Sequence, residues 1–269
     1  MQKLDAHCHF WSLGRGDYDW LEGEGGPLAP IRRDYAPEDY PGDRKLIAVQ
    51  AAATLAETDF LLDLAGREPR ILGVVGWVDL ESPEAVAQLE ARAANPVFRG
   101  VRPMLQDIAE IDWLLRAPRK DALDALARLG LRFDLLITER HLPVAARFAA
   151  ANPELPLVID HGAKPQPGDR SAWAEGMRAL ARDRRIHCKL SGLMTEVPDP
   201  ADLREVMGQL LDWFGPERLI WGSDWPVMTL AAPYEDWVAA SEGALEGLTP
   251  DERAAVLGGN AARFYGVTP

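Results

Sequence analysis

Short apolar runs alternate with stretches of helical period along almost the whole chain, and this alternation limits the possible folds more than any other feature. The apolar runs, which we interpret as strands, cover residues 3–11, 46–53, 71–80, 98–105, 132–138, 155–161, 186–193 and 219–225. The helical stretches cover residues 57–67, 83–94, 119–129, 140–151, 171–184, 200–214 and 234–245, and a last one covers 250–257. Eight strands that are each followed by a helix within about 250 residues predict an α/β fold, the (β/α)8 or TIM barrel.

The competing fold is a doubly wound open sheet, whose nucleotide-binding form carries a Gly-x-Gly-x-x-Gly turn after an early strand. The sequence has no such turn there. Three helices have clear start signals, because Ser82-Pro83, Asp199-Pro200 and Thr249-Pro250 each place a side-chain acceptor before a proline at the first helical position. With no internal repeat and no linker between parts, we expect a single domain over residues 1–269.

Composition excludes several classes of protein. The 29 Lys and Arg against 42 Asp and Glu give a net charge of -13, which repels polyanions, so we expect no nucleic-acid partner. No run of about 18 apolar residues occurs, so we expect no membrane span. Two cysteines, Cys8 and Cys188, and the absence of an apolar leader after Met1 predict a cytoplasmic protein. The sequence leaves open whether it is a monomer or a homodimer.

The first predicted strand carries a His-x-His pair. Successive side chains of a strand point to opposite faces, so His7 and His9 share a face, roughly 7 Å apart along the strand. The same parity adds Asp5 and Trp11 to that face and places Ala6, Cys8 and Phe10 on the other. Cys8 is therefore a poor candidate ligand, whereas the two imidazoles can converge on one ion or one substrate oxygen.

Polar residues end several of the other predicted strands, where the reactive groups of such a barrel lie. His161 ends the sixth strand and Asp224 ends the eighth, so together with His7 and His9 they form a His-x-His, His, Asp set on one rim. Gln50, Arg102 and Lys189 belong to the second, fourth and seventh strands. Four reactive side chains on one rim of one barrel indicate a catalytic site.

These motifs make the chain resemble a known family. Asp-Ala-His-Cys-His-Phe-Trp at residues 5–11, His-Gly-Ala-Lys-Pro at 161–165 and Gly-Ser-Asp-Trp-Pro at 222–226 are similar to the amidohydrolase superfamily. More narrowly, the chain resembles the amidohydrolase-2 branch that includes sugar lactonases of the fuconolactonase and rhamnonolactonase type. Residues 49–62 and 100–107 also look like that branch, and the similarity runs over nearly the whole chain.

The resemblance implies hydrolysis of a sugar-derived lactone to its aldonate, and the residues suit that chemistry. Opening an ester needs a base for water, an electrophile at the carbonyl and a proton for the departing alkoxide. Asp224 is the candidate base, which takes a proton from water and returns it to the ring hydroxyl. His7, His9 and His161 are the candidates to polarise the carbonyl, either directly or through one divalent ion that they and Asp224 bind.

The sequence leaves open whether a metal is bound. Zinc is the ion expected for imidazole and carboxylate ligands, and catalysis without a metal is the alternative. Binuclear members of the superfamily add a lysine on strand four and a histidine at the end of strand five. This sequence has Arg102 and Leu136-Ile137-Thr138 there, which argues against a two-metal centre.

Further residues are candidates for substrate binding. Arg102 is the candidate for a hydroxyl or the product carboxylate, because guanidinium offers paired donors. The other candidates are Gln50, Trp11, Trp225, Lys189 and Tyr18. Tyr18 lies in a long Gly- and Pro-bearing segment, residues 12–43, which is either a flap over the site or a surface excursion. We expect His141 to cap or pack a helix, His187 to be structural and Lys164 to face solvent.

Two rival functions remain. Decarboxylases related to aminocarboxymuconate semialdehyde decarboxylase, and a pyrone-dicarboxylate hydrolase, share the His-x-His, His, Asp layout. The dicarboxylate would require several convergent arginines, of which the sequence places only Arg102. A barrel that binds a sugar acid without turnover is the rival from another class, but it would not need the acid and base set.

Overall fold

The protein folds as one parallel barrel of eight strands, so the predicted (β/α)8 architecture is confirmed. The computed structural model describes residues 3–23 and 25–269. Each strand pairs in parallel with the next, in the order β1 to β8. The strands are β1 Leu4–Cys8, β2 Lys45–Val49, β3 Ile71–Gly76, β4 Phe98–Val101, β5 Arg132–Leu135, β6 Leu157–Ile159, β7 His187–Leu190 and β8 Leu219–Trp221.

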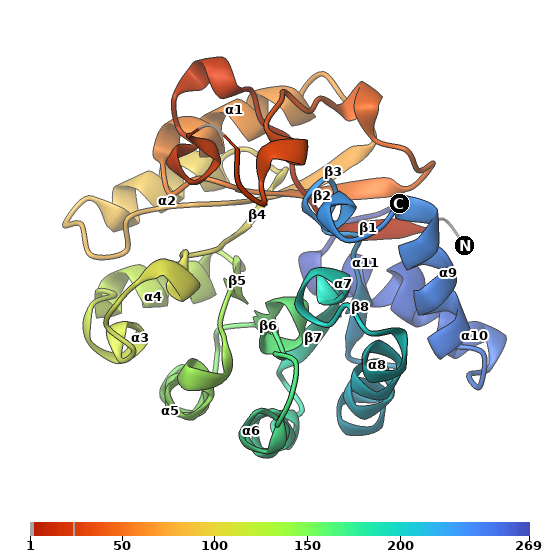
Figure 1. Ribbon diagram of the computed structural model, residues 1–269. Coiled ribbons are helices and arrows are strands. Elements are labelled where there is room, and N and C mark those ends of the chain that lie inside the picture. The colour runs from red at the N-terminus through yellow and green to blue at the C-terminus, as the bar shows by residue number, and fades with distance from the viewer. Residues whose placement is uncertain (1–2, 24) are drawn as a thin grey trace.

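The helices surround the strands in chain order, from α1 and α2 in orange to α9 and α10 in blue (Figure 1). Their bounds are α1 Leu55–Ala65, α2 Ala85–Ala93, α3 Trp113–Arg116, α4 Lys120–Arg128, α5 Leu142–Ala151, α6 Ser171–Ala181, α7 Leu193–Glu196, α8 Pro200–Phe214, α9 Tyr234–Ala244, α10 Pro250–Ala254 and α11 Asn260–Tyr265. The short helices α3 and α7 were not predicted, because four residues are too few to show a helical period.

Two of the three predicted helix caps are confirmed. The Asp199 carboxylate accepts the backbone N–H groups of Ala201 and Asp202 at the start of α8, and Thr249 caps α10. Ser82 does not cap α2, which begins at Ala85; its hydroxyl accepts the N–H of Glu84 in the preceding turn instead. The strands are also shorter than predicted. The polar residues at their carboxyl-terminal ends leave the sheet and form the loops of that rim of the barrel, which we call the upper rim.

Two clusters of apolar side chains form the core. The larger one lies between strands and helices and includes Phe133 and Phe148, whose ring centroids are 5.2 Å apart. The smaller cluster consists of alternate residues of the strands, such as Ile47 and Ile220, which pack against Tyr265 of α11. Side chains therefore fill the lower barrel, which leaves the upper ends of the strands for polar groups.

The first strand does not keep the simple alternation that the sequence predicted. Its pairing with β2 shifts register between Asp5 and Cys8, so one extra residue is accommodated there. Ala6 consequently belongs to the smaller, inner cluster, whereas Cys8 belongs to the larger one. The Asp5 carboxylate accepts the Tyr40 hydroxyl at 2.8 Å and the N–H of His7 at 3.0 Å, so the expectation that Asp5 and Ala6 follow strict parity was wrong.

Backbone hydrogen bonds close the barrel between its first and last strands. The N–H of His9 donates to the carbonyl of Trp225 and the N–H of Asp224 donates to the carbonyl of His7, both at 2.7 Å. Asp5 adds a third link, because its carboxylate also accepts the N–H of Ser223 at 2.8 Å. The seam of the barrel thus runs through the His-x-His pair and Asp224.

Residues 12–43 form a long excursion after β1, as predicted. Outside residue 24, which the structure does not describe, the excursion contains four single turns of 3-10 helix, Leu13–Arg15, Asp19–Leu21, Ala29–Ile31 and Pro37–Asp39. Trp11, just before the excursion, pairs with Tyr35 within it through two backbone hydrogen bonds. In the described part of the chain, no helix has both the length and the apolar character needed to cross a membrane.

The close approach at the seam makes Gly222 a test of this arrangement. A methyl group on Gly222 would lie 2.7 Å from Cβ of His7 and 3.1 Å from its backbone nitrogen. We expect Gly222→Ala to lower the free energy of unfolding by about 1–3 kcal/mol, as overpacking does, and to reduce activity by displacing His7. Urea unfolding and a rate measurement check both effects.

The matched control is Gly208→Ala in α8, where an added Cβ has no heavy atom within 4 Å. This change should be neutral or stabilise the helix by about 0.5–1 kcal/mol. Equal behaviour of the two variants would contradict the proposed tight contact at the seam.

Candidate active site

Three imidazoles meet one carboxylate at the upper ends of the strands. The Nε2 atoms of His9, His7 and His161 lie 3.2, 3.7 and 3.8 Å from Oδ1 of Asp224. His7 and His9 come from β1, His161 follows β6 and Asp224 follows β8. All four side chains are buried, and none of the four residues exposes more than 5% of its surface. The structure therefore brings together the set that the sequence distributed over three strands.

The loops that carry two of these residues adopt unusual backbone angles. His161 has φ of 52° and Asp224 has φ of 62°, and the residues from His161 to Lys164 all lie in the left-handed region. This conformation costs a non-glycine residue roughly 1–2 kcal/mol. It is held by the hydrogen bond of the Trp173 indole N–H to the carbonyl of Gly162 at 2.7 Å. Packing thus fixes His161 in a strained but defined position.

Burial determines the charge of the site. Burial lowers the pKa of His161 to about 4 despite the nearby carboxylates of Asp224 and Asp160. Burial, together with the Lys189 ammonium, also lowers the pKa of His7 well below its usual value. Burial would raise the pKa of Asp224, but the imidazoles of His161, His9 and His7 outweigh it and hold that pKa low. Near neutral pH, Asp224 is therefore an ionised carboxylate facing neutral rings at His7 and His161.

His9 has a tautomer set by its surroundings. Its Nδ1 lies 2.8 Å from the carbonyl of Val49, which can only accept, so Nδ1 carries the proton. In a neutral ring Nε2 then holds a lone pair, and it faces Oδ1 of Asp224 at 3.2 Å. Two acceptors at this separation require a proton or a metal ion between them. This pair is consequently suited to hold a cation.

The wider donor set fits one ion, although one histidine fits less well than the others. Two groups have their ligand atoms within 4.8 Å of one another: His7, His9 and Asp224, and His7, Asp160 and His161. A metal-binding histidine normally donates its second ring N–H to an acceptor, as His9 does to a carbonyl. At His7 the closest group to Nδ1 is instead Nζ of Lys189, a donor, at 3.0 Å. Within the first group, His9 and Asp224 therefore fit an ion, whereas His7 fits less well as the third ligand.

A cavity of about 320 Å³ opens above these groups, large enough for a small cyclic ester. Its floor contains His9, His161, Asp224 and Arg102, and its walls are mostly apolar. The remaining lining residues are Trp20, Leu28, Ala51, Met104, Gln106, Asp107, Leu136, Lys164 and Val227.

Of the predicted substrate-binding residues, Arg102 is the one that lines this cavity. Gln50 lies beneath it, where its amide N–H donates to the carbonyl of Arg102 at 2.6 Å. Lys189 is fully buried under His7. The three predicted aromatic residues are likewise buried, and they pack in the interior of the protein rather than on the cavity wall that the structure describes: Trp11, Trp225 and Tyr18.

The other two histidines lie away from the cavity, whereas Lys164 lies beside it. His141 caps its own turn, because its Nδ1 accepts the N–H of Thr138 at 3.2 Å, and His187 lies at the start of β7, the end opposite the site. The prediction for His141 is confirmed, and His187 has the position that was expected for it. Lys164 does not simply face solvent, since it lines the cavity and pairs with Glu196 at 3.0 Å.

Sequence reasoning missed several residues of the site. Trp20 lines the cavity from the long excursion and donates its indole N–H to the carbonyl of Ala51 at 2.8 Å. Asp160 and Asp134 form ion pairs beneath the imidazoles, and Glu57 accepts the N–H groups of Ala51 and Ala52. The sequence does contain a signal for two of these carboxylates. Asp134 and Asp160 lie in otherwise apolar strand runs, where an acidic residue needs a buried partner.

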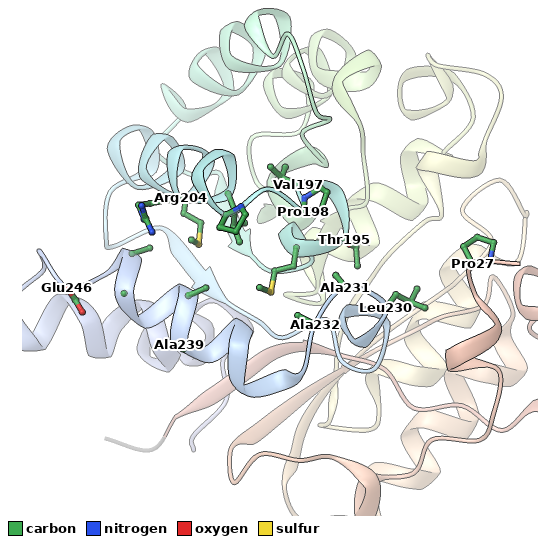
Figure 2. A pocket seen from close by; sticks show the side chains of 17 residues that line it. Pro27, Thr195, Val197, Pro198, Arg204, Leu230, Ala231, Ala232, Ala239 and Glu246 are labelled. Atoms are coloured by element: carbon green, nitrogen blue, oxygen red, sulfur yellow. The ribbon is translucent and has the colours of Figure 1, made fainter.

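A larger hollow, of about 860 Å³, lies elsewhere on the molecule. Figure 2 shows its wall, with Val197 and Pro198 before α8, Arg204 on α8 and Ala239 on α9. Its lining is mainly apolar and contains none of the three imidazoles or Asp224. The chemistry of the residues, rather than the size of the hollow, therefore identifies the smaller cavity as the candidate active site.

Comparison with known proteins agrees with this geometry. The family model described as amidohydrolase matches residues 4–267. An L-fucono-1,5-lactonase from Burkholderia ambifaria is 44% identical over 98% of this chain and 95% of its own length. A second L-fucono-1,5-lactonase, from Burkholderia multivorans, is 39% identical over the same shares. The crystal structure of an amidohydrolase from Burkholderia multivorans with bound zinc superposes with a TM-score of 0.89, at 36% identity over 100% of both chains.

The buried carboxyl of Glu57 predicts a pH dependence of stability. Burial raises the pKa of Glu57 to about 7, against 4.5 for an ordinary glutamate, even though Ala51 and Ala52 donate to it. The folded state therefore favours the protonated form, and this contribution to stability is full below pH 4.5 and is lost as pH rises through 7. The unfolding free energy of the wild type minus that of Glu57→Gln should therefore fall between about pH 5 and pH 8.

Urea unfolding of both proteins at the two pH values measures this difference. The matched control is Glu235→Gln, at an exposed position on α9, for which the difference from wild type should not change with pH. A wild-type advantage over Glu57→Gln that grows toward the higher pH would contradict the assignment.

Proposed function

This chain belongs to the amidohydrolase family, and from that premise we propose that it hydrolyses a sugar-derived lactone, such as L-fucono- or L-rhamnono-lactone, to the aldonate. The observation that carries the proposal is the convergence of three Nε2 atoms on Oδ1 of Asp224, which lines a cavity of about 320 Å³ together with His9 and His161. The names of the two similar lactonases support the choice of substrate.

The proposed reaction follows from the protonation states of the side chains at the floor of the cavity. Asp224, as an ionised carboxylate, accepts a proton from water while the water oxygen bonds to the lactone carbonyl carbon. The Arg102 guanidinium and the His161 imidazole, which line the cavity, donate to the carbonyl oxygen and stabilise the negative charge that develops on it. The bond from the carbon to the ring oxygen then breaks, and Asp224 returns the proton to that oxygen. The products are a free hydroxyl and a carboxylic acid, which releases a proton at neutral pH.

The cavity walls suit a cyclic sugar derivative. Trp20, Leu28 and Val227 offer apolar surface to the less polar side of a ring, and aromatic side chains commonly contact sugar rings this way. Gln106 and Asp107, which also line the cavity, provide polar groups for hydroxyls. The excursion that carries Trp20 and Leu28 therefore has a role in closing the site.

A dicarboxylate substrate is less well supported. Among the cavity-lining residues Arg102 and Lys164 are the cations, and Lys164 already pairs with Glu196. A 2-pyrone-4,6-dicarboxylic acid hydrolase of Pseudomonas putida is similar in fold, with a TM-score of 0.74, but at 24% identity this likeness extends to the fold alone. The lactone of a sugar acid needs fewer fixed cations and remains the better match.

The proposal is tested with purified protein and a panel of aldono-1,5- and aldono-1,4-lactones, following proton release above spontaneous hydrolysis. We expect turnover of one or more 6-deoxy sugar lactones, and we expect Asp224→Asn to lower kcat by roughly 10²- to 10⁴-fold because it removes the base. Turnover confined to pyrone, muconate or aromatic acids would overturn the lactone assignment. Binding of an aldonate without any turnover would favour the non-catalytic alternative.

We propose further that the site takes at most one divalent ion, zinc being the expected one, through His9 and Asp224, with His161, whose Nε2 lies 3.8 Å from Oδ1 of Asp224, as the third ligand. When bound, such an ion would act as a Lewis acid toward the carbonyl. Titration of metal-free protein with Zn²⁺ should saturate at one ion per chain. His9→Asn should abolish that uptake, whereas His187→Asn, at the other end of the barrel, should preserve it. Two bound ions, or uptake that survives in His9→Asn, would contradict this assignment.

A further inference from the structure

Two arginine side chains approach each other at the lower end of the barrel, opposite the candidate active site. Arg99 lies in β4 and Arg132 begins β5. Arg132 precedes the buried Asp134 by two residues, so these two side chains point to the same face of the strand. Arg99 and Ile47 lie over the same face of Gly73, because a Cβ atom there would meet both within 2.9 Å. Ile47 belongs to the smaller, inner cluster, so Arg99 lies at the lower edge of the barrel interior.

Two carbonyl groups hold the Arg132 guanidinium in place. Its Nε donates to the carbonyl of Phe264 in α11, and its Nη1 donates to the carbonyl of Gly130. The third nitrogen, Nη2, makes no hydrogen bond within residues 3–23 and 25–269. Because the planar group is fixed by its other two nitrogens, Nη2 has a defined direction and its protons remain to be donated.

Arg99 has no hydrogen-bonding partner in the part of the chain that the structure describes, and its Nε is buried without an acceptor. Burial lowers the pKa of Arg99, and burial together with the Arg99 guanidinium lowers the pKa of Arg132. No described carboxylate raises either pKa. Two like charges therefore face each other without a counter-charge between them.

The two guanidinium groups flank one opening beside Gly266. This residue follows α11 with φ of 64°. A Cβ atom on Gly266 would lie 3.6 Å from Nη2 of Arg132 and 4.0 Å from Nη1 of Arg99, and apart from its chain neighbours no other described heavy atom would lie within 4 Å. In charge-assisted hydrogen bonds of about 2.8 Å, the central atom of an oxyanion lies roughly 3.5–4 Å from the donor nitrogen. The spacing of the two nitrogens around the opening therefore suits one such ion.

The end of α11 does not cancel the positive charge of the opening. A helix C-terminus carries roughly half a negative charge, which Arg132 meets through the carbonyl of Phe264. Two guanidinium groups therefore leave a net charge of about +1.5 beside Gly266. The chain's net charge of -13 acts at longer range, and salt screens it over about 8–10 Å. The local charge thus favours an anion here, although the protein as a whole repels anions.

We propose that Arg99 and Arg132 form a binding site for one small oxyanion of the phosphate class at the lower end of the barrel. Nη2 of Arg132 and the Arg99 guanidinium donate to different oxygens of this ion, which also relieves the repulsion between the two cations. A phosphate group has enough terminal oxygens to bridge two guanidinium groups, whereas a carboxylate is matched to a single one. The site shares no residue with the active-site cavity, so this inference does not depend on the proposed lactone hydrolysis.

Isothermal titration calorimetry of the full chain with inorganic phosphate, at an ionic strength held constant with sodium chloride, tests the proposal. We expect the wild type to bind one phosphate with a Kd on the order of 1 mM. Arg99→Gln should raise that Kd at least about tenfold, because it removes one charge and its paired donors. Absence of uptake by the wild type would refute the site. So would uptake that persists in Arg99→Gln, since the anion would then lie elsewhere, for example at Arg102 in the cavity.

The matched control is Arg182→Gln, which removes the same charge from an exposed position at the end of α6. This variant should bind phosphate as the wild type does, and equal weakening in both variants would reveal a general effect of net charge instead of a site. Thermal unfolding is a second readout. Saturating phosphate should raise the Tm of the wild type and of Arg182→Gln but not that of Arg99→Gln, because an anion that binds only the folded protein stabilises it.

Titration with glycerol 3-phosphate separates the two sources of a phosphate group. Binding that is similar to that of inorganic phosphate, and that is lost in Arg99→Gln, would assign the site to the phosphate group of a small ester. Binding of inorganic phosphate alone would assign the site to the free ion. Acetate that binds more tightly than phosphate would contradict the phosphate class.

Discussion

The closure of the barrel between β1 and β8 is the constraint on which the rest of the site depends. Two backbone hydrogen bonds of 2.7 Å join His7 and His9 to Asp224 and Trp225. The same contacts that stabilise the barrel therefore fix the distance between the imidazoles and the carboxylate. Asp5 strengthens this seam through the shift in register of β1, because it accepts N–H groups from both sides. Because the site lies on this seam, no flexible loop has to move to bring Asp224 next to the imidazoles.

Buried charges form a second layer beneath this seam. Asp134 and Asp160 flank Lys189, and this group costs desolvation energy that an apolar core would not. Burial, opposed by Lys189, raises the pKa of Asp134 to about 6, whereas Lys189 and His7 outweigh burial and hold the pKa of Asp160 low. Such a network is weak evidence for stability. Its value lies in orientation, because Lys189 at 3.0 Å and Asp160 at 3.5 Å from Nδ1 of His7 fix the position of this ring.

The upper wall of the cavity has a different origin. The excursion after β1 supplies Trp20, and the indole N–H of this residue is tied to the carbonyl of Ala51. Ala51 is in turn held by the buried carboxylate of Glu57. A residue of the first helix, α1, is thus connected through one strand end to the aromatic wall. The excursion therefore contributes Trp20 to the cavity wall and, through the Tyr40 hydroxyl, a hydrogen bond to Asp5 at the seam.

The sequence alone determined the barrel, its strand order and the set of His7, His9, His161 and Asp224, because apolar periodicity and strand-end position are local properties of the chain. The tertiary structure alone decided which groups face those four. Strict strand parity failed at Asp5 and Ala6, where register depends on the neighbouring strand. Trp20, distant in sequence from the floor, reaches the cavity, whereas Trp11 and Trp225, adjacent to the reactive residues, do not line it. Burial and charge partners arise from contacts between distant segments, and no local pattern encodes them.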